Sequence, residues 1–142
     1  MSPASSILAH FARRFRFLAL LRASLVAGAL YDLGFAVLLT VEPVWAARTL
    51  QLPLPPLPEG AFYLWIVAVL LLMLAALYLL AARDTRRYSG IVAVAIGGRL
   101  LGGLVLLAAA LRASGVPGLL PMAAGDLFFG IAHAALWLPI RS

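Results

Sequence analysis

Residues 62–82, with the sequence FYLWIVAVLLLMLAALYLLAA, decide the fold class of this chain. The stretch carries no charged residue and is long enough to cross a membrane, because a helix needs roughly 20 mainly apolar residues to span the hydrocarbon core. The whole chain of 142 residues is 65% hydrophobic and only 11% charged, with a mean hydropathy of +1.08. In a soluble domain about a quarter of the residues are charged. The composition therefore predicts an integral membrane protein.

Three further apolar stretches are long enough to span a bilayer, at about residues 23–41, 91–111 and 119–140. Together with residues 62–82 they predict a single integral membrane domain over residues 1–142. The expected fold is all-α: an antiparallel four-helix transmembrane bundle with an interfacial N-terminal segment. The short polar turn between the second and third spans predicts that these two helices are antiparallel neighbours.

The regions outside the spans differ in character. Before the first span, aromatic and aliphatic residues interleave with arginines, as in a helix that lies on an anionic membrane surface. The outer loop over residues 42–60 is rich in proline. Its residues 43–50 can form a short interfacial helix, with Pro43 in the first turn and Trp45 as an anchor. Residues 53–58 hold too many prolines for a helix or a sheet and are expected to be extended.

The arginines predict how the chain is oriented in the membrane. All eleven basic residues are arginines, and most lie at the ends of apolar runs. A cytoplasmic N-terminus places Arg13, Arg14, Arg16, Arg22, Arg83, Arg86, Arg87 and Arg141 inside, and Arg48 and Arg112 outside. This asymmetry follows the positive-inside rule and predicts a multi-pass membrane protein with both termini in the cytoplasm. The same placement indicates membrane lipid as a partner and argues against nucleic acid.

The ionisable residues inside the predicted spans are the main candidates for a functional site. They are Asp32, Arg99, Asp126 and His133. Each charge at a helix centre costs roughly 2.5–3.5 kcal/mol on insertion scales, so these residues are expected to pair. Arg99 can bridge both aspartates, because a guanidinium offers five donors in a fork. The cluster is either a structural clasp among three helices or a polar pocket for a ligand or protons.

His133 is also the candidate for binding a cofactor. The surrounding sequence GIAHAALW at residues 130–137 is loosely similar to the pigment-binding helix of bacterial light-harvesting polypeptides, but Phe129 stands where those have a small residue. The alternative is a bundle histidine bonded to a hydroxyl or carbonyl. No cofactor is predicted outright, and a pigment or quinone stays open. With no cysteine, thiol chemistry is excluded, and no catalytic triad, phosphate loop or metal-ligand cluster is present in the sequence.

Glycines inside the predicted spans indicate close helix packing. Small residues let helix backbones approach where lipid supplies no hydrophobic driving force. Within the chain, such packing is expected at Gly28, Gly98, Gly102, Gly103 and Gly130, of which Gly98 and Gly102 form a G-x-x-x-G pattern. A dimer face is the other role that this pattern allows.

Four short motifs carry a family resemblance. They are YDLGF at 31–35, YLLAARD at 78–84, GRLLG at 98–102 and GDLFF at 125–129. The sequence resembles a family of small uncharacterised bacterial four-helix membrane proteins that are distantly similar to the DoxX-like proteins. The resemblance covers most of the chain and implies the four-helix fold, with an aspartate early in the first helix and a basic residue in the third. It implies no particular activity.

Three classes of function are compatible with the sequence. The first is a non-catalytic accessory or assembly subunit of a larger respiratory or photosynthetic membrane complex, with other membrane subunits as partners. The second is a stand-alone bundle that binds or transports a small molecule or protons through the intramembrane cluster. The third is a small membrane enzyme acting on a lipid or quinone. The small size and the lack of catalytic motifs favour the first class.

Overall fold

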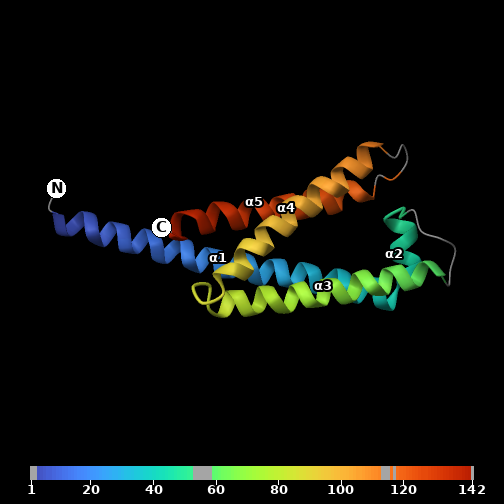
Figure 1. The fold of residues 1–142 in the computed structure, drawn as a ribbon, viewed down its shortest axis with the longest axis horizontal. Helices are drawn as coiled ribbons and strands as arrows, with labels where there is room; N and C mark the ends of the chain where they lie inside the picture. Colours follow the sequence, from blue (N-terminus) through green and yellow to red (C-terminus); the bar gives the residue numbers. More distant parts are fainter. Residues whose placement is uncertain (1–2, 53–58, 113–115, 117, 142) are drawn as a thin grey trace.

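The computed structural model of the chain is an all-α bundle, and it describes residues 3–52, 59–112, 116 and 118–141, with side chains from residue 12 onward. The helices are α1 (Pro3–Val41), α2 (Pro43–Thr49), α3 (Glu59–Arg83), α4 (Ser89–Arg112) and α5 (Leu119–Arg141), as shown in Figure 1. Four of them, α1 from Ala12, α3, α4 and α5, are long and apolar enough to cross a membrane. The predicted fold class is therefore confirmed.

The helix ends lie where the sequence changes from apolar to polar. Helix α3 begins at Glu59 and ends at Arg83, so an acidic and a basic side chain flank it in the favourable order for the helix dipole. The short helix predicted in the outer loop is present as α2, with Pro43 in its first turn. The extended conformation predicted for residues 53–58 falls outside the described residues.

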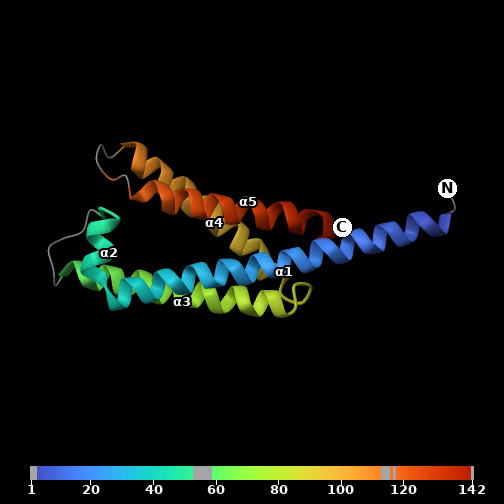
Figure 2. The same cartoon turned by 180° about the vertical axis from the view of Figure 1, so that it is seen from behind.

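Helix α1 is longer than the sequence predicted. Its 39 residues span roughly 58 Å at 1.5 Å per residue, about twice the thickness of a hydrocarbon core. Its N-terminal part extends past the other helices (Figures 1 and 2). The expected N-terminal segment is thus a continuation of the first span, because no glycine or proline interrupts residues 4–27.

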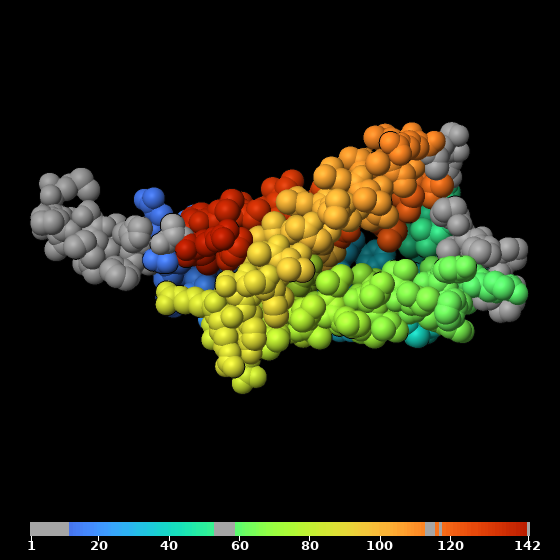
Figure 3. Space-filling model, in the orientation of Figure 1, coloured from blue at the N-terminus to red at the C-terminus, as the bar shows by residue number. Residues whose placement is uncertain are grey.

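The spanning helices pack as two pairs, α1 with α3 and α4 with α5, and the pairs meet chiefly through α1 and α5. The predicted neighbours α3 and α4 contact each other much less. They lie together near their connecting turn, where Tyr78 and Ala81 share a core cluster with Val92 and Ala95. Beyond it, α4 runs away from α3 and along α5 (Figure 1). Figure 3 shows the resulting hollow between α3 and α4, with α1 visible behind it.

Two buried apolar clusters hold the bundle together, one near each end. The cluster near the α3–α4 turn consists of Leu21, Leu25, Ala29, Ala75, Tyr78, Ala81, Val92, Ala95 and Trp137. The cluster near the connection between α1 and α3 consists of Ala36, Leu39, Ala46, Leu64 and Ala68, so α2 is packed against the bundle. On α1, Asp32 lies between Ala29 of the first cluster and Ala36 of the second. The polar residues predicted inside the membrane therefore lie between two apolar layers.

Candidate functional site: a buried arginine between two aspartates

Arg99 on α4 pairs with both intramembrane aspartates. Its Nη2 lies 2.5 Å from Oδ1 of Asp32 on α1, and its Nη1 donates to Oδ1 of Asp126 on α5. The Arg99 side chain is 5% exposed, that of Asp32 is fully buried and that of Asp126 is 20% exposed. The structure thus brings together three of the four predicted residues, with the bridging geometry expected from the arginine fork. We call Asp32, Arg99 and Asp126 the arginine clasp.

The remaining donors of Arg99 reach two further groups. Its Nε donates to the hydroxyl of Tyr78 on α3 at 3.0 Å, and its Nη2 also faces the backbone carbonyl of Gly28 on α1 at 3.4 Å. Arg99 therefore connects all four spanning helices from a single position on α4. Tyr78 was not among the predicted site residues, although this tyrosine offers one of the few hydroxyl groups in the charge-free span.

Aromatic rings surround the guanidinium. Its central carbon lies 5.3 Å from the ring centroids of Tyr31 and Tyr78 and 5.6 Å from that of Phe129. Rings at this distance attract a cation through their negative faces, most strongly where water is excluded. Tyr31 precedes Asp32, and Phe129 follows Asp126 by three residues. The neighbours of the two aspartates thus supply two of the rings.

The arginine clasp has one more acidic group than basic groups. When all three side chains are ionised, the cluster carries one net negative charge between apolar layers, and such a buried charge is costly. Oδ2 of Asp32 is buried and has no hydrogen-bond partner among the described residues. One proton or one small cation would neutralise the cluster. The geometry therefore fits both a structural clasp and a site for a single positive charge.

His133 lies beside the clasp without joining its hydrogen bonds. The side chain is buried, and its ring packs against those of Tyr78 and Phe129, with both centroid distances at 5.9 Å. The backbone of Ser24 on α1 is nearby, but neither ring nitrogen has a hydrogen-bond partner in the described part of the chain. The hydrogen bond expected for a bundle histidine stays a prediction, with the backbone of Ser24 as its candidate partner. Over the described ranges, no three His, Asp or Glu side chains converge on a metal position.

Four of the five predicted packing glycines lie at close helix contacts. A Cβ at Gly103 would meet Leu127 at 2.7 Å, and one at Gly130 would meet Leu100 at 2.8 Å, so both glycines bring α4 and α5 together. A Cβ at Gly28 would meet His133 at 3.4 Å, and one at Gly102 would meet Asp126 at the same distance.

The prediction of packing within the chain is wrong for Gly98. A Cβ at this position would meet nothing within 4 Å, and the residue is exposed. The reason is its place next to Arg99. Successive residues of an α-helix point about 100° apart, so turning Arg99 into the bundle turns Gly98 outward. The same outward face includes Gly97, which also has open space around it.

Sequence reasoning missed a close approach beside the clasp. A Cβ at Gly125 would lie 2.6 Å from the hydroxyl of Tyr31, so the glycine makes room for the ring that covers Arg99. The GDLFF motif could have indicated this close approach, because its glycine directly precedes Asp126. The clasp thus depends on a small residue at its edge as well as on its charges.

The comparisons with known proteins leave the family open. No family model, no curated protein and no solved structure matches this chain. What the sequence and fold together establish is a polytopic helical membrane protein with four spanning helices, whose lipid contact follows from the apolar residues exposed on their surfaces.

Proposed function

We propose that this chain is a non-catalytic accessory or assembly subunit of a larger respiratory or photosynthetic complex in the bacterial inner membrane. The exposed face of α4 carries the proposal. Gly97 and Gly98 lie there beside Val94, Leu101 and Val105, which are 70%, 65% and 60% exposed. Their spacing places them on one side of the helix. Two adjacent glycines on an apolar face allow a partner's transmembrane helix to approach more closely than lipid requires.

The polar interior supports a non-catalytic role. The guanidinium of Arg99 is committed to Asp32, Asp126, Tyr78 and a backbone carbonyl. A group with these partners is not free to bind a substrate, and it is well placed to fix the register of four helices. The resemblance to small bacterial four-helix proteins, distantly DoxX-like, is compatible with this role and implies no activity of its own.

Orientation forms part of the same proposal. The N-terminal part of α1, the α3–α4 turn and the C-terminus of α5 lie at one end of the bundle (Figure 1). Eight of the eleven arginines belong to these segments. By the positive-inside rule this end faces the cytoplasm, together with both termini.

Substitution of Gly98 tests the subunit role. The wild-type chain, extracted gently from its native membranes, is expected to co-purify with a larger complex that mass spectrometry and an absorption spectrum can identify. Gly98→Leu fills the open space on α4 and is expected to release the chain from that complex while it stays folded. Gly34→Leu is the matched control, because Gly34 is also exposed and a Cβ there would meet nothing within 4 Å. A wild-type chain that elutes alone and colourless would contradict the proposal.

A second candidate function is binding or transport of a proton or a small cationic molecule. It is favoured by the net negative charge of the clasp and by the buried Oδ2 of Asp32, which has no partner among the described residues. Asp126→Asn removes the excess charge, and the asparagine carbonyl can still accept from Arg99. This variant is expected to melt near the wild-type temperature and to lose proton or cation flux in liposomes. Glu59→Gln, at the exposed start of α3, serves as the control. Wild-type flux equal to that of empty liposomes would exclude transport.

A further inference from the structure

A second polar feature lies away from the clasp, at the end of the bundle that holds the α3–α4 turn. It is a cavity of about 610 Å³ between the N-terminal part of α1, this turn, the first residues of α4 and the last turn of α5. Arg14, Arg86 and Arg141 line it from three different segments, and no acidic residue is among the described residues of its lining. The fold therefore brings arginines from distant parts of the sequence together around this cavity and makes it positively charged.

Two of these arginines are held in place by contacts within the chain. Nη2 of Arg14 donates to the backbone carbonyl of Ile140 at 3.0 Å, which ties α1 to the end of α5. The guanidinium of Arg141 lies over the ring of Trp137, 4.9 Å from its centroid. An arginine with a fixed position loses less conformational freedom when it binds an anion. The site is thus partly organised before any ligand arrives.

Thr85 provides independent evidence for a polar ligand. It lines the cavity, its side chain is 3% exposed, and its hydroxyl has no hydrogen-bond partner among the described residues. A buried hydroxyl without a partner is unfavourable, and a ligand oxygen would satisfy it. Helix α4 begins at Ser89, and Ser89 and Gly90 both line the cavity, so the N-terminus of a long helix lies at its wall.

We propose that this cavity binds the phosphate of an anionic phospholipid headgroup. Guanidinium groups, a hydroxyl and a helix N-terminus are the donors that bind phosphate in proteins. The other walls are apolar, with Leu18, Ala93 and Ile140 beside Trp137, and they suit the glycerol and upper acyl chain of a lipid better than a free ion. The cavity is level with the ends of α3 and α5, the depth at which headgroups lie.

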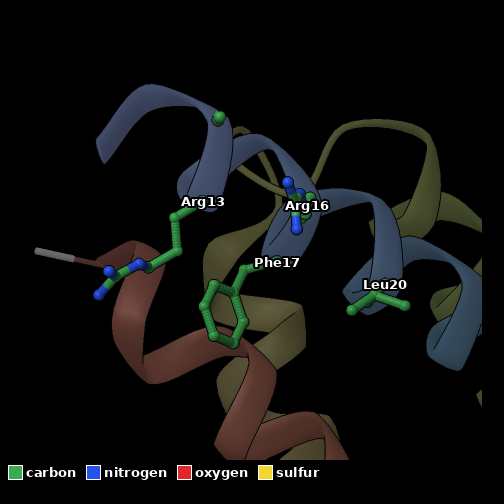
Figure 4. Close-up of a pocket in the computed structure, with 5 residues that line it drawn as sticks. Arg13, Arg16, Phe17 and Leu20 are labelled. Atoms are coloured by element: carbon green, nitrogen blue, oxygen red, sulfur yellow. The ribbon is translucent and has the colours of Figure 1, made fainter. Parts of the chain in front are cut away.

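In the described part of the chain, a neighbouring pocket is lined by residues of α1 alone. Figure 4 shows Arg13, Arg16, Phe17 and Leu20, which line it and project from successive turns of this one helix. Such a surface attracts an anionic membrane generally, whereas the cavity above takes its donors from several segments. The lipid site is independent of the proposed subunit role, because it uses none of the residues on the outer face of α4.

The test is the binding of phosphatidylglycerol to the purified full-length chain in neutral detergent, measured by native mass spectrometry. Phosphatidylcholine and inorganic phosphate are the comparison ligands, and both are expected to bind much more weakly. A surface arginine is worth about a fivefold change in affinity for anionic lipid. Arg86→Gln is expected to weaken phosphatidylglycerol binding by more than this factor. Arg87 lies in the same turn but outside the cavity lining, so Arg87→Gln is expected to weaken binding by no more than this factor. Equal losses for the two variants, or phosphate binding as tightly as the lipid, would overturn the proposal.

Thr85→Val separates a ligand role from a structural one. Valine has nearly the same shape and buries no hydroxyl, so the melting temperature without lipid is expected to stay the same or rise. Binding of phosphatidylglycerol is expected to weaken about fivefold, the effect of one hydrogen bond. A lower melting temperature with unchanged lipid binding would show that the hydroxyl serves the fold alone, and it would overturn its assignment to the site.

Discussion

The Arg99→Leu variant is expected to be strongly destabilised. Leucine removes the partner of two carboxylates between apolar layers and leaves Asp32 fully buried with no opposite charge. Breaking a buried ion pair in this way destabilises a protein by about 3–5 kcal/mol, a large part of a typical folding free energy of about 5–15 kcal/mol. The variant should therefore show a much lower yield and melting temperature in detergent than the wild-type chain.

Two further variants make this expectation specific to the clasp. Arg112→Leu removes an arginine from the exposed end of the same helix and is expected to melt like the wild-type chain. Adding Asp32→Asn and Asp126→Asn to Arg99→Leu removes the unpaired charges and is expected to restore part of the lost stability, because replacing all members of a buried ionic cluster is often nearly neutral. If Arg99→Leu alone melts at the wild-type temperature, the clasp does not hold the helices together.

The bilayer explains why the spans and the clasp could be predicted from the sequence. A spanning helix must be apolar over roughly 20 residues, which fixed the positions of α3, α4 and α5 to within a few residues. A charge in such a helix needs a partner, and the chain offers one arginine for two aspartates inside the spans. Few pairings satisfy this requirement. The contact of Arg99 with both aspartates could be predicted because it is the only arginine inside the predicted spans.

The helix pairing and the outward face of α4 could not be predicted in the same way. In a soluble bundle, apolar residues mark the buried face of each helix. In a membrane, both the lipid-facing and the buried faces are apolar, so α4 carries exposed Val94 and Leu101 as well as buried Val92 and Ala95. Only the polar residues report the rotation of each helix. In α4, the buried position expected for Arg99 indicates how the helix is rotated. The adjacent Gly98 could therefore have been predicted to face away from the bundle.

Gly103 and Gly98 lie on the same helix but differ in their surroundings. Substitution by valine is therefore expected to lower the melting temperature at Gly103 and to leave it unchanged at Gly98. Gly103→Val places a branched side chain where a Cβ alone would lie 2.7 Å from the side chain of Leu127 and 3.1 Å from its backbone nitrogen. Because the backbone of α5 cannot yield, α4 and α5 must move apart next to Asp126, and we expect a melting temperature lower by about 5–10 °C in detergent. Gly98→Val meets open space and should melt like the wild-type chain. Equal melting temperatures for both variants would mean that the contact between α4 and α5 does not depend on the small size of Gly103.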